Sequence, residues 1–188
     1  MHSFSPLTIG KGVDSLKQGK IIAYPTESVF GLGCDPCNIA ALEALLFLKQ
    51  RSPSKGMILI ASSIDQIERY IDFTSLPKEQ WLHIQSTWPG PHTWVFPVSQ
   101  DTPLLIQGPN HTIALRVTQH PVAVALCSAF GGAIVSTSAN ISNLEPLRDG
   151  AKVFAQFGDK IAGVIAGSVG DLPKPTTVQN ALTLEVYR

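Results

Sequence analysis

Apolar positions along the chain follow two spacings, and these predict both strands and helices. Short apolar or alternating runs predict strands, whereas apolar residues three and four positions apart predict helices. The predicted strands cover residues 20–24, 57–61, 93–98, 112–117, 133–135, 163–166, 177–179 and 182–187. The predicted helices cover residues 39–50, 63–71, 77–87, 121–130 and 151–157. Because strands and helices alternate for much of the length, the pattern predicts an α/β domain with a mixed sheet.

Helix boundaries are marked by residues with known capping preferences. Asn38 is a typical N-cap for the helix that starts at residue 39. Ser63 and Gln66 resemble a capping box that opens a short helix. Pro121 at a first helical position and Gly131 after the last turn bracket a further helix. The strands that follow residue 93 lie close together in the sequence, which favours some antiparallel pairing.

Composition places the chain among folded, weakly charged domains. Its 188 residues contain 14 Lys and Arg against 14 Asp and Glu, so the formal net charge is zero. Hydrophobic residues make up 44% of the chain and charged residues 15%, below the ~25% charged residues of an average domain. A chain this apolar buries enough surface to fold, which excludes disorder. Zero net charge excludes a strongly basic nucleic-acid coat, although a local basic patch stays open.

The cysteines and the chain ends indicate a cytoplasmic protein. Cys34, Cys37 and Cys127 are few and odd in number, which is typical of a reducing compartment. We interpret the first two as reduced loop thiols, because a zinc site needs two further ligands at matching spacing. No apolar run approaches the ~20 residues of a membrane span. Residues 1–12 lack a cationic segment followed by an apolar run, so we expect no signal peptide.

Three cations fall within seven residues, at Lys49, Arg51 and Lys55. Two of them lie at the end of a predicted helix, where cations satisfy the helix dipole and the last carbonyl groups. The same trio is also suited to a polyanion, because Arg offers a planar fork for phosphate oxygens and Lys a mobile point charge. Spacing alone leaves both readings open.

Two further segments carry candidate chemistry. The apolar strand 133–135 leads directly into Ser136, Thr137, Ser138 and Asn140, which suits either a turn with a helix cap or a site for phosphate or ribose. In strand 112–117, alternation places Arg116 on the face opposite the larger apolar residues. An Arg in an apolar strand needs an anionic partner, which is either a ligand or a structural ion pair.

Five segments, taken in this order, resemble the threonylcarbamoyl-AMP synthase family of tRNA-modification proteins. They are Tyr24-Pro-Thr-Glu with Phe30-Gly-Leu-Gly-Cys34, Lys49-Gln-Arg51, Trp88-Pro-Gly-Pro, Ala114-Leu-Arg-Val and Ser136-Thr-Ser-Ala-Asn140. The family hallmark, K-x-R paired with a distant S-x-N, is met by Lys49 and Arg51 with Ser138 and Asn140. The resemblance implies one α/β domain over residues 7–188, without a second domain. It also implies a twisted mixed sheet flanked by helices, with a concave cationic cavity.

The resemblance further implies a nucleotidyltransferase that makes L-threonylcarbamoyladenylate and pyrophosphate from L-threonine, bicarbonate and ATP. ATP is then a substrate accompanied by Mg²⁺, and no tightly bound cofactor and no protein metal site are expected. The downstream partner is a tRNA-threonylcarbamoyl transferase complex, and direct binding of tRNA or double-stranded RNA is a further expectation. No membrane association is expected.

The resemblance also implies roles for individual residues. Lys49 and Arg51 are expected to be catalytic. The ATP-binding set comprises Lys49, Arg51, Lys55, Thr112, Ser138, Asn140, Arg148 and Thr176. The threonine-binding set comprises Thr26, Arg116 and Ser138. Such chemistry depends mainly on positioning the reactants and neutralising phosphate charge.

Two other functions compete with the synthase. A non-catalytic RNA-binding module would hold RNA on a cationic concave surface, and salt-sensitive RNA binding without ATP consumption would identify it. A different adenylating enzyme of the same fold would release pyrophosphate even when threonine or bicarbonate is omitted.

Overall fold

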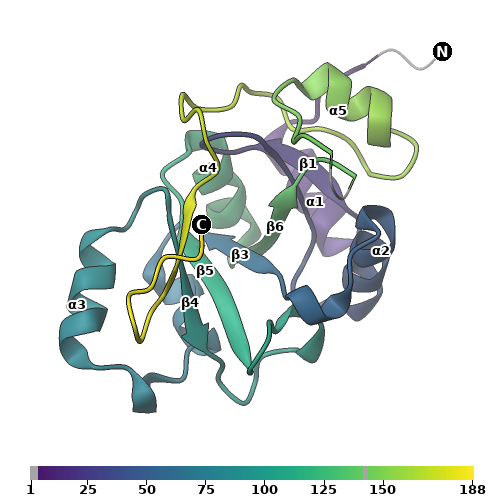
Figure 1. The fold of residues 1–188 in the computed structure, drawn as a ribbon. Coiled ribbons are helices and arrows are strands. Elements are labelled where there is room, and N and C mark those ends of the chain that lie inside the picture. The colour runs from purple at the N-terminus through teal and green to yellow at the C-terminus, as the bar shows by residue number, and fades with distance from the viewer. Residues whose placement is uncertain (1–3, 142–143) are drawn as a thin grey trace.

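The computed structural model describes residues 4–141 and 144–188, which form a seven-stranded mixed sheet with helices on both faces (Figure 1). The strands are β1 (Ile22–Pro25), β2 (Phe30–Gly33), β3 (Ile58–Ala61), β4 (His92–Pro97), β5 (Thr112–Val117), β6 (Ile134–Ser138) and β7 (Thr177–Asn180). The α-helices are α1 (Ile9–Lys17), α2 (Ile39–Lys49), α3 (Lys78–Ser86), α4 (Pro121–Phe130) and α5 (Gly150–Phe157). The predicted α/β class is therefore confirmed.

The strand order across the sheet is β1-β2-β6-β3-β5-β4-β7. β3 pairs with β5 and β4 with β7 in parallel, whereas the remaining neighbours are antiparallel. The prediction of a mixed sheet, with antiparallel pairing after residue 93, is therefore correct.

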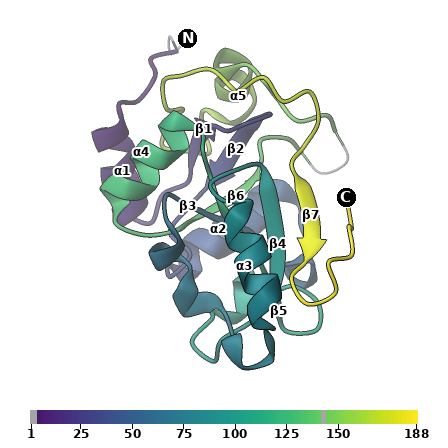
Figure 2. The same cartoon turned by 90° about the vertical axis from the view of Figure 1, so that its left-hand side faces the viewer.

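The strand register decides which side chains share a face, because successive residues of a strand point to opposite sides. On one face, Leu59, Leu115 and Val135 are neighbours in the core that α2, α3 and α5 cover. On the other face, Ile60 and Ile134 are neighbours and pack with α1 and α4. Figure 2 shows these two helices side by side against the sheet.

On the face that carries α1 and α4, the two helices cover Ile60 and Ile134 but leave a neighbouring row of residues uncovered. Ile58, Ala114 and Ser136 are register partners in this row, two residues along their strands from the covered row. Val95 of β4 and Asn180 of β7 continue it towards the sheet edge. All five line cavities. This part of the sheet is therefore the floor on which the candidate site is built.

Residues 63–71 do not form the predicted short helix. They make two 3-10 turns, Ile64–Gln66 and Glu68–Tyr70, and Ser63 forms no side-chain cap. The side-chain oxygen of Gln66 instead accepts hydrogen bonds from the backbone N–H and the hydroxyl of Ser62. This local bond replaces the capping box, which explains why the prediction is wrong.

The sequence pattern also missed α1 and β2. β2 contains two glycines, which are poor strand formers. A Cβ at Gly33 would collide with the Val135 carbonyl oxygen, so close strand approach requires glycine there. Residues 163–166 and 182–187 form isolated bridges instead of the predicted strands. Among the described residues, no helix combines the length and the apolar character needed to span a membrane.

Candidate functional site

Two adjoining cavities lie over the open part of the sheet. The smaller one has a volume of about 170 Å³ and the larger one about 630 Å³. They share four lining residues, Arg51, Met57, Ile58 and Arg188. A pocket for a drug-sized ligand usually measures ~300–1,000 Å³, so the larger cavity has the size needed for a nucleotide. The smaller cavity lies below this range and has room only for a molecule as small as an amino acid.

The walls of both cavities are cationic. Their described lining residues include Arg51, Lys55, Arg116 and Arg188, with no Asp or Glu among them. Partial burial and then the charge of Arg188 lower the pKa of Arg51. Partial burial and then the charge of Arg116 lower the pKa of Arg188. Because these guanidinium groups repel one another, an anionic ligand would relieve the repulsion.

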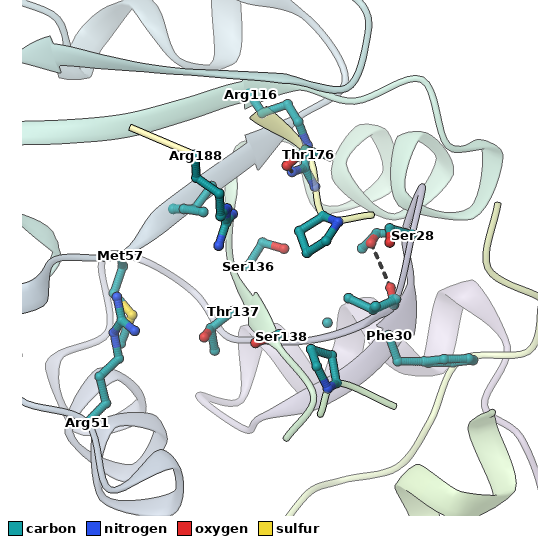
Figure 3. Close-up of a pocket in the computed structure, with 16 residues that line it drawn as sticks. Ser28, Phe30, Arg51, Met57, Arg116, Ser136, Thr137, Ser138, Thr176 and Arg188 are labelled. Carbon is teal, nitrogen blue, oxygen red and sulfur yellow. Dashed lines mark hydrogen bonds between the residues drawn. The ribbon is translucent and has the colours of Figure 1, made fainter. Parts of the chain in front are cut away.

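Arg188 reaches the cavities because the end of the chain folds back along β7. The carbonyl of Arg188 accepts a hydrogen bond from Val178 N–H at 2.9 Å, and Val186 bridges to Gln179. Figure 3 shows the Arg188 side chain entering the same space as Ser136 and Thr176. Neither composition nor spacing indicated this residue, since it follows the last predicted strand.

Arg116 projects from β5 into the smaller cavity, on the face that strand alternation predicted. Its Nη1 donates to Thr176 Oγ1 at 2.8 Å. Its Nη2 lies 3.3 Å from Glu27 Oε2, and both side chains are buried. Burial alone would raise the pKa of Glu27, but Arg116 and the Thr118 hydroxyl hold it below its ordinary value. Arg116 therefore has a structural ion pair and also faces a cavity.

Hydroxyl groups complete the smaller cavity. Thr26, Ser28, Ser136, Ser138 and Thr176 all line it. Thr26 Oγ1 donates to the Val29 carbonyl at 2.7 Å, which closes the turn between β1 and β2. Ser28 Oγ is buried without a hydrogen-bond partner among the described residues. The sequence pattern identifies Ser136 as a candidate in the segment 136–140, but neither of the two binding sets includes it. Ser28 is a residue that sequence reasoning missed, although it lies between the quoted motifs at 24–27 and 30–34.

Lys49 links the end of α2 to the end of β6. Its ammonium is buried and donates to the carbonyls of Ser138 and Asn140 and to Asn140 Oδ1, the last two at 2.6 and 2.7 Å. Ser138 Oγ donates to the same Asn140 Oδ1 at 2.7 Å. The two halves of the K-x-R and S-x-N hallmark are therefore brought together. Ser138 lines the smaller cavity, whereas Lys49 and Asn140, which bond to it, line neither of the two cavities.

Arg51 and Lys55 lie on the segment that joins α2 to β3. Arg51 Nη2 donates to the Gly56 carbonyl at 3.0 Å, and its Nε donates to the same oxygen at 3.3 Å. Lys55 is exposed and lines the larger cavity, as does Thr112 at the start of β5. Arg148 lines neither of the two cavities. Its guanidinium is exposed and donates to the carbonyls of Leu172 and Gly170 at 3.0 and 3.3 Å.

The donor set does not fit a metal site built by the protein. Mg²⁺ prefers carboxylate, phosphate and water oxygens. The described walls of the two cavities offer hydroxyls and cations, and Glu27, which lies next to them, is paired with Arg116. No group of three or more His, Cys, Asp and Glu that could hold a metal occurs in residues 4–141 and 144–188.

Comparison with known families gives one match over most of the chain. The Sua5–YciO–YrdC family model, described as "Telomere recombination", matches residues 14–188. A protein of Aliivibrio fischeri named threonylcarbamoyl-AMP synthase is 52% identical over 176 residues, covering 94% of this chain and 95% of that protein. A protein of the same name from Enterobacter sp. is 47% identical over 189 residues, covering 100% and 99% of the two chains.

Solved structures share the fold. P. abyssi Sua5 complexed with L-threonine superimposes with a TM-score of 0.84 at 30% identity, covering 92% of this chain and 50% of that one. The present chain therefore spans about half the length of that Sua5. E. coli YciO gives a TM-score of 0.83 at 22% identity, covering 100% and 97% of the two chains. At that identity the likeness concerns the fold alone.

Proposed function

The chain belongs to the Sua5–YciO–YrdC family, and on this basis we propose that it is a threonylcarbamoyl-AMP synthase. It takes L-threonine, bicarbonate and ATP and releases pyrophosphate, which makes it a nucleotidyltransferase. The observation that carries this proposal is the pair of adjoining cavities. A small hydroxyl-rich cavity with a buried arginine opens, across Arg51 and Arg188, into a larger cationic one.

The smaller cavity is assigned to threonine. The Arg116 guanidinium binds the carboxylate, because its planar fork of N–H donors matches two carboxylate oxygens. Thr26, Ser136 and Thr176 supply hydroxyl groups for the polar remainder of the amino acid. Ser28 Oγ, which is buried and has no described partner, is available for the same substrate. The contact of Thr176 with Arg116 favours a threonine-side role over the ATP role that the family resemblance implied.

The larger cavity is assigned to ATP. Arg51 and Arg188 lie where the cavities meet and neutralise the phosphates nearest to threonine. Lys55 and Thr112 line the part farther from threonine and contact the rest of the nucleotide. Lys49 does not contact ATP in this assignment. Its ammonium donates to the Ser138 carbonyl and so fixes the backbone from which the Ser138 hydroxyl projects. Because the walls offer no free carboxylate, Mg²⁺ arrives with the ATP phosphates instead of residing on the protein.

The chemistry then needs positioning more than covalent help. The threonine ammonium group first loses a proton, and the free amine then attacks the bicarbonate carbon. An N–C bond forms, a C–O bond of bicarbonate breaks, and water leaves with a carbamate as the product. A carbamate oxygen attacks the α-phosphorus, a new O–P bond forms, and the bond to the β-phosphate bridging oxygen breaks. Pyrophosphate carries away the electron pair. The arginines stabilise charge that develops on the phosphates, which is the usual source of catalysis in phosphoryl transfer.

Pyrophosphate release by the purified protein tests the proposal. Release is expected only when threonine, bicarbonate and ATP are all present, and a tRNA-threonylcarbamoyl transferase complex then consumes the adenylate. Release with threonine or bicarbonate omitted would identify a different adenylating enzyme. Salt-sensitive RNA binding without ATP consumption would identify the RNA-binding module instead.

A further inference from the structure

Glu27 lies in the chain between Thr26 and Ser28, which both line the smaller cavity, and it pairs with the lining residue Arg116, yet it does not line either cavity itself. It is 4% exposed, and Arg116 is 5% exposed. Its Oε2 faces Arg116 Nη2 at 3.3 Å and makes no hydrogen bond to a described residue. The attraction between these two atoms is therefore that of an ion pair in a poorly solvated place, where charges interact strongly.

The position of the Glu27 carboxylate is fixed from several directions. Oε1 accepts hydrogen bonds from Thr118 Oγ1 at 2.6 Å and from Gln119 N–H at 3.3 Å. The Glu27 carbonyl accepts from Leu172 N–H at 3.3 Å, and the Thr26 carbonyl accepts from Gly170 N–H at 3.0 Å. The turn after β1 is thus tied both to the end of β5 and to the loop before β7. Such bracing leaves the carboxylate little freedom to move away from Arg116.

We propose that Glu27 is a positioning residue that sets the specificity of the smaller cavity by orienting Arg116 and cancelling much of its charge. The inference rests on the proposed function of that cavity. Arg51 and Arg188 already make the shared wall cationic. An uncompensated Arg116 would add a third positive charge, and inorganic phosphate would then occupy the amino-acid cavity. With Glu27 in place, Arg116 keeps its directional N–H donors but exerts a weaker field, which favours a zwitterionic amino acid over a dianion.

Steady-state kinetics with Glu27→Gln test the proposal. This variant keeps the shape and removes the negative charge. We expect the KM for threonine to rise about tenfold or more, because truncating one partner of a buried charge pair is costly. The KM for ATP should change little. Inorganic phosphate should become a competitive inhibitor against threonine, and Glu27→Asp should restore part of the threonine affinity. Glu43→Gln, on the exposed side of α2, is the matched control and should behave as wild type.

Several outcomes would overturn the proposal. Equal rises in both KM values would show general damage to the site, and unchanged phosphate inhibition would remove the charge-compensation argument. If Glu27→Gln does not fold, Thr118→Val loosens the same carboxylate and should raise the threonine KM by a smaller factor. Calorimetric titration with phosphate separates this proposal from the proposed function. Tighter phosphate binding by Glu27→Gln than by wild type supports charge compensation even if wild type releases no pyrophosphate, and equal binding refutes it.

Discussion

Replacing Lys49 by Met tests whether the lysine of the K-x-R motif stabilises the fold, as distinct from binding phosphate as Arg51 does. Met retains most of the side-chain volume and removes the ammonium that donates to Ser138 and Asn140. Each buried acceptor that loses its partner costs ~1–3 kcal/mol. Part of this cost is offset, because removing the ammonium also removes the free-energy cost of burying its charge. We therefore expect Lys49→Met to lower the free energy of unfolding by about 2 kcal/mol, within the usual range for loss of a buried network.

Thermal unfolding followed by tryptophan fluorescence measures this effect. A loss of about 2 kcal/mol lowers the Tm by roughly 4–8 °C in a domain of this size. Arg51→Ala is the matched control, because its side chain is half-buried and, within residues 4–141 and 144–188, its hydrogen bonds go to the neighbouring carbonyls of Lys55 and Gly56. It should lower turnover by more than about tenfold, as loss of a group that stabilises transition-state charge does, while leaving the Tm nearly unchanged. If Lys49→Met has the same Tm as wild type, Lys49 does not stabilise the segment Ser138–Asn140, and the reasoning is refuted.

The pH dependence of activity gives a second measure of the same group. Burial and then the charge of Arg51 lower the pKa of Lys49 to about 8. A neutral amine has fewer N–H donors than the ammonium, so its hydrogen bonds to the carbonyls of Ser138 and Asn140 become fewer and weaker. Turnover should therefore fall as the pH rises through about 8. Lys49→Arg should move this decline to higher pH, and an unchanged decline would assign it to another group.

Three further predictions concern the arginines and the ion pair. Arg116→Ala should raise the threonine KM more than the ATP KM, and pyrophosphate release with each substrate varied measures both; equal effects would remove the carboxylate role. Arg188→Ala should raise the ATP KM, whereas Arg69→Ala should not, because Arg69 lines neither cavity. The pKa of Glu27 lies below its ordinary 4.5, so the ion pair contributes fully above pH 4.5 and is lost as the pH falls through the lower folded-state value. Wild type should therefore be more stable than Glu27→Gln at pH 7, and this advantage should shrink below pH 4.5, as melting curves would show.

Much of the fold could be predicted from local patterns. The β5 strand and the α4 helix have the bounds that alternation, Pro121 and Gly131 indicate. Such elements carry their signals within a few residues, because apolar spacing and capping act locally. The sequence pattern does not predict β2, because its two glycines have a low strand propensity. The position of β2 in the sheet depends on its close approach to Val135 of β6, which lies far away in the sequence. The turns at 63–71 were misjudged because two local hydrogen-bonding schemes compete for Gln66.

The candidate site divides in the same way. The sequence by itself determined that Arg116 faces away from the large apolar side chains of its strand, because successive side chains alternate across a strand. It also identified the cations and hydroxyls that the family resemblance joins. Only the tertiary structure decided that Glu27 pairs with Arg116, that the Lys49 ammonium bonds to the Ser138 carbonyl, and that Arg188 lines both cavities. These contacts join segments far apart in the chain, and they exist only once the strand order brings those segments together.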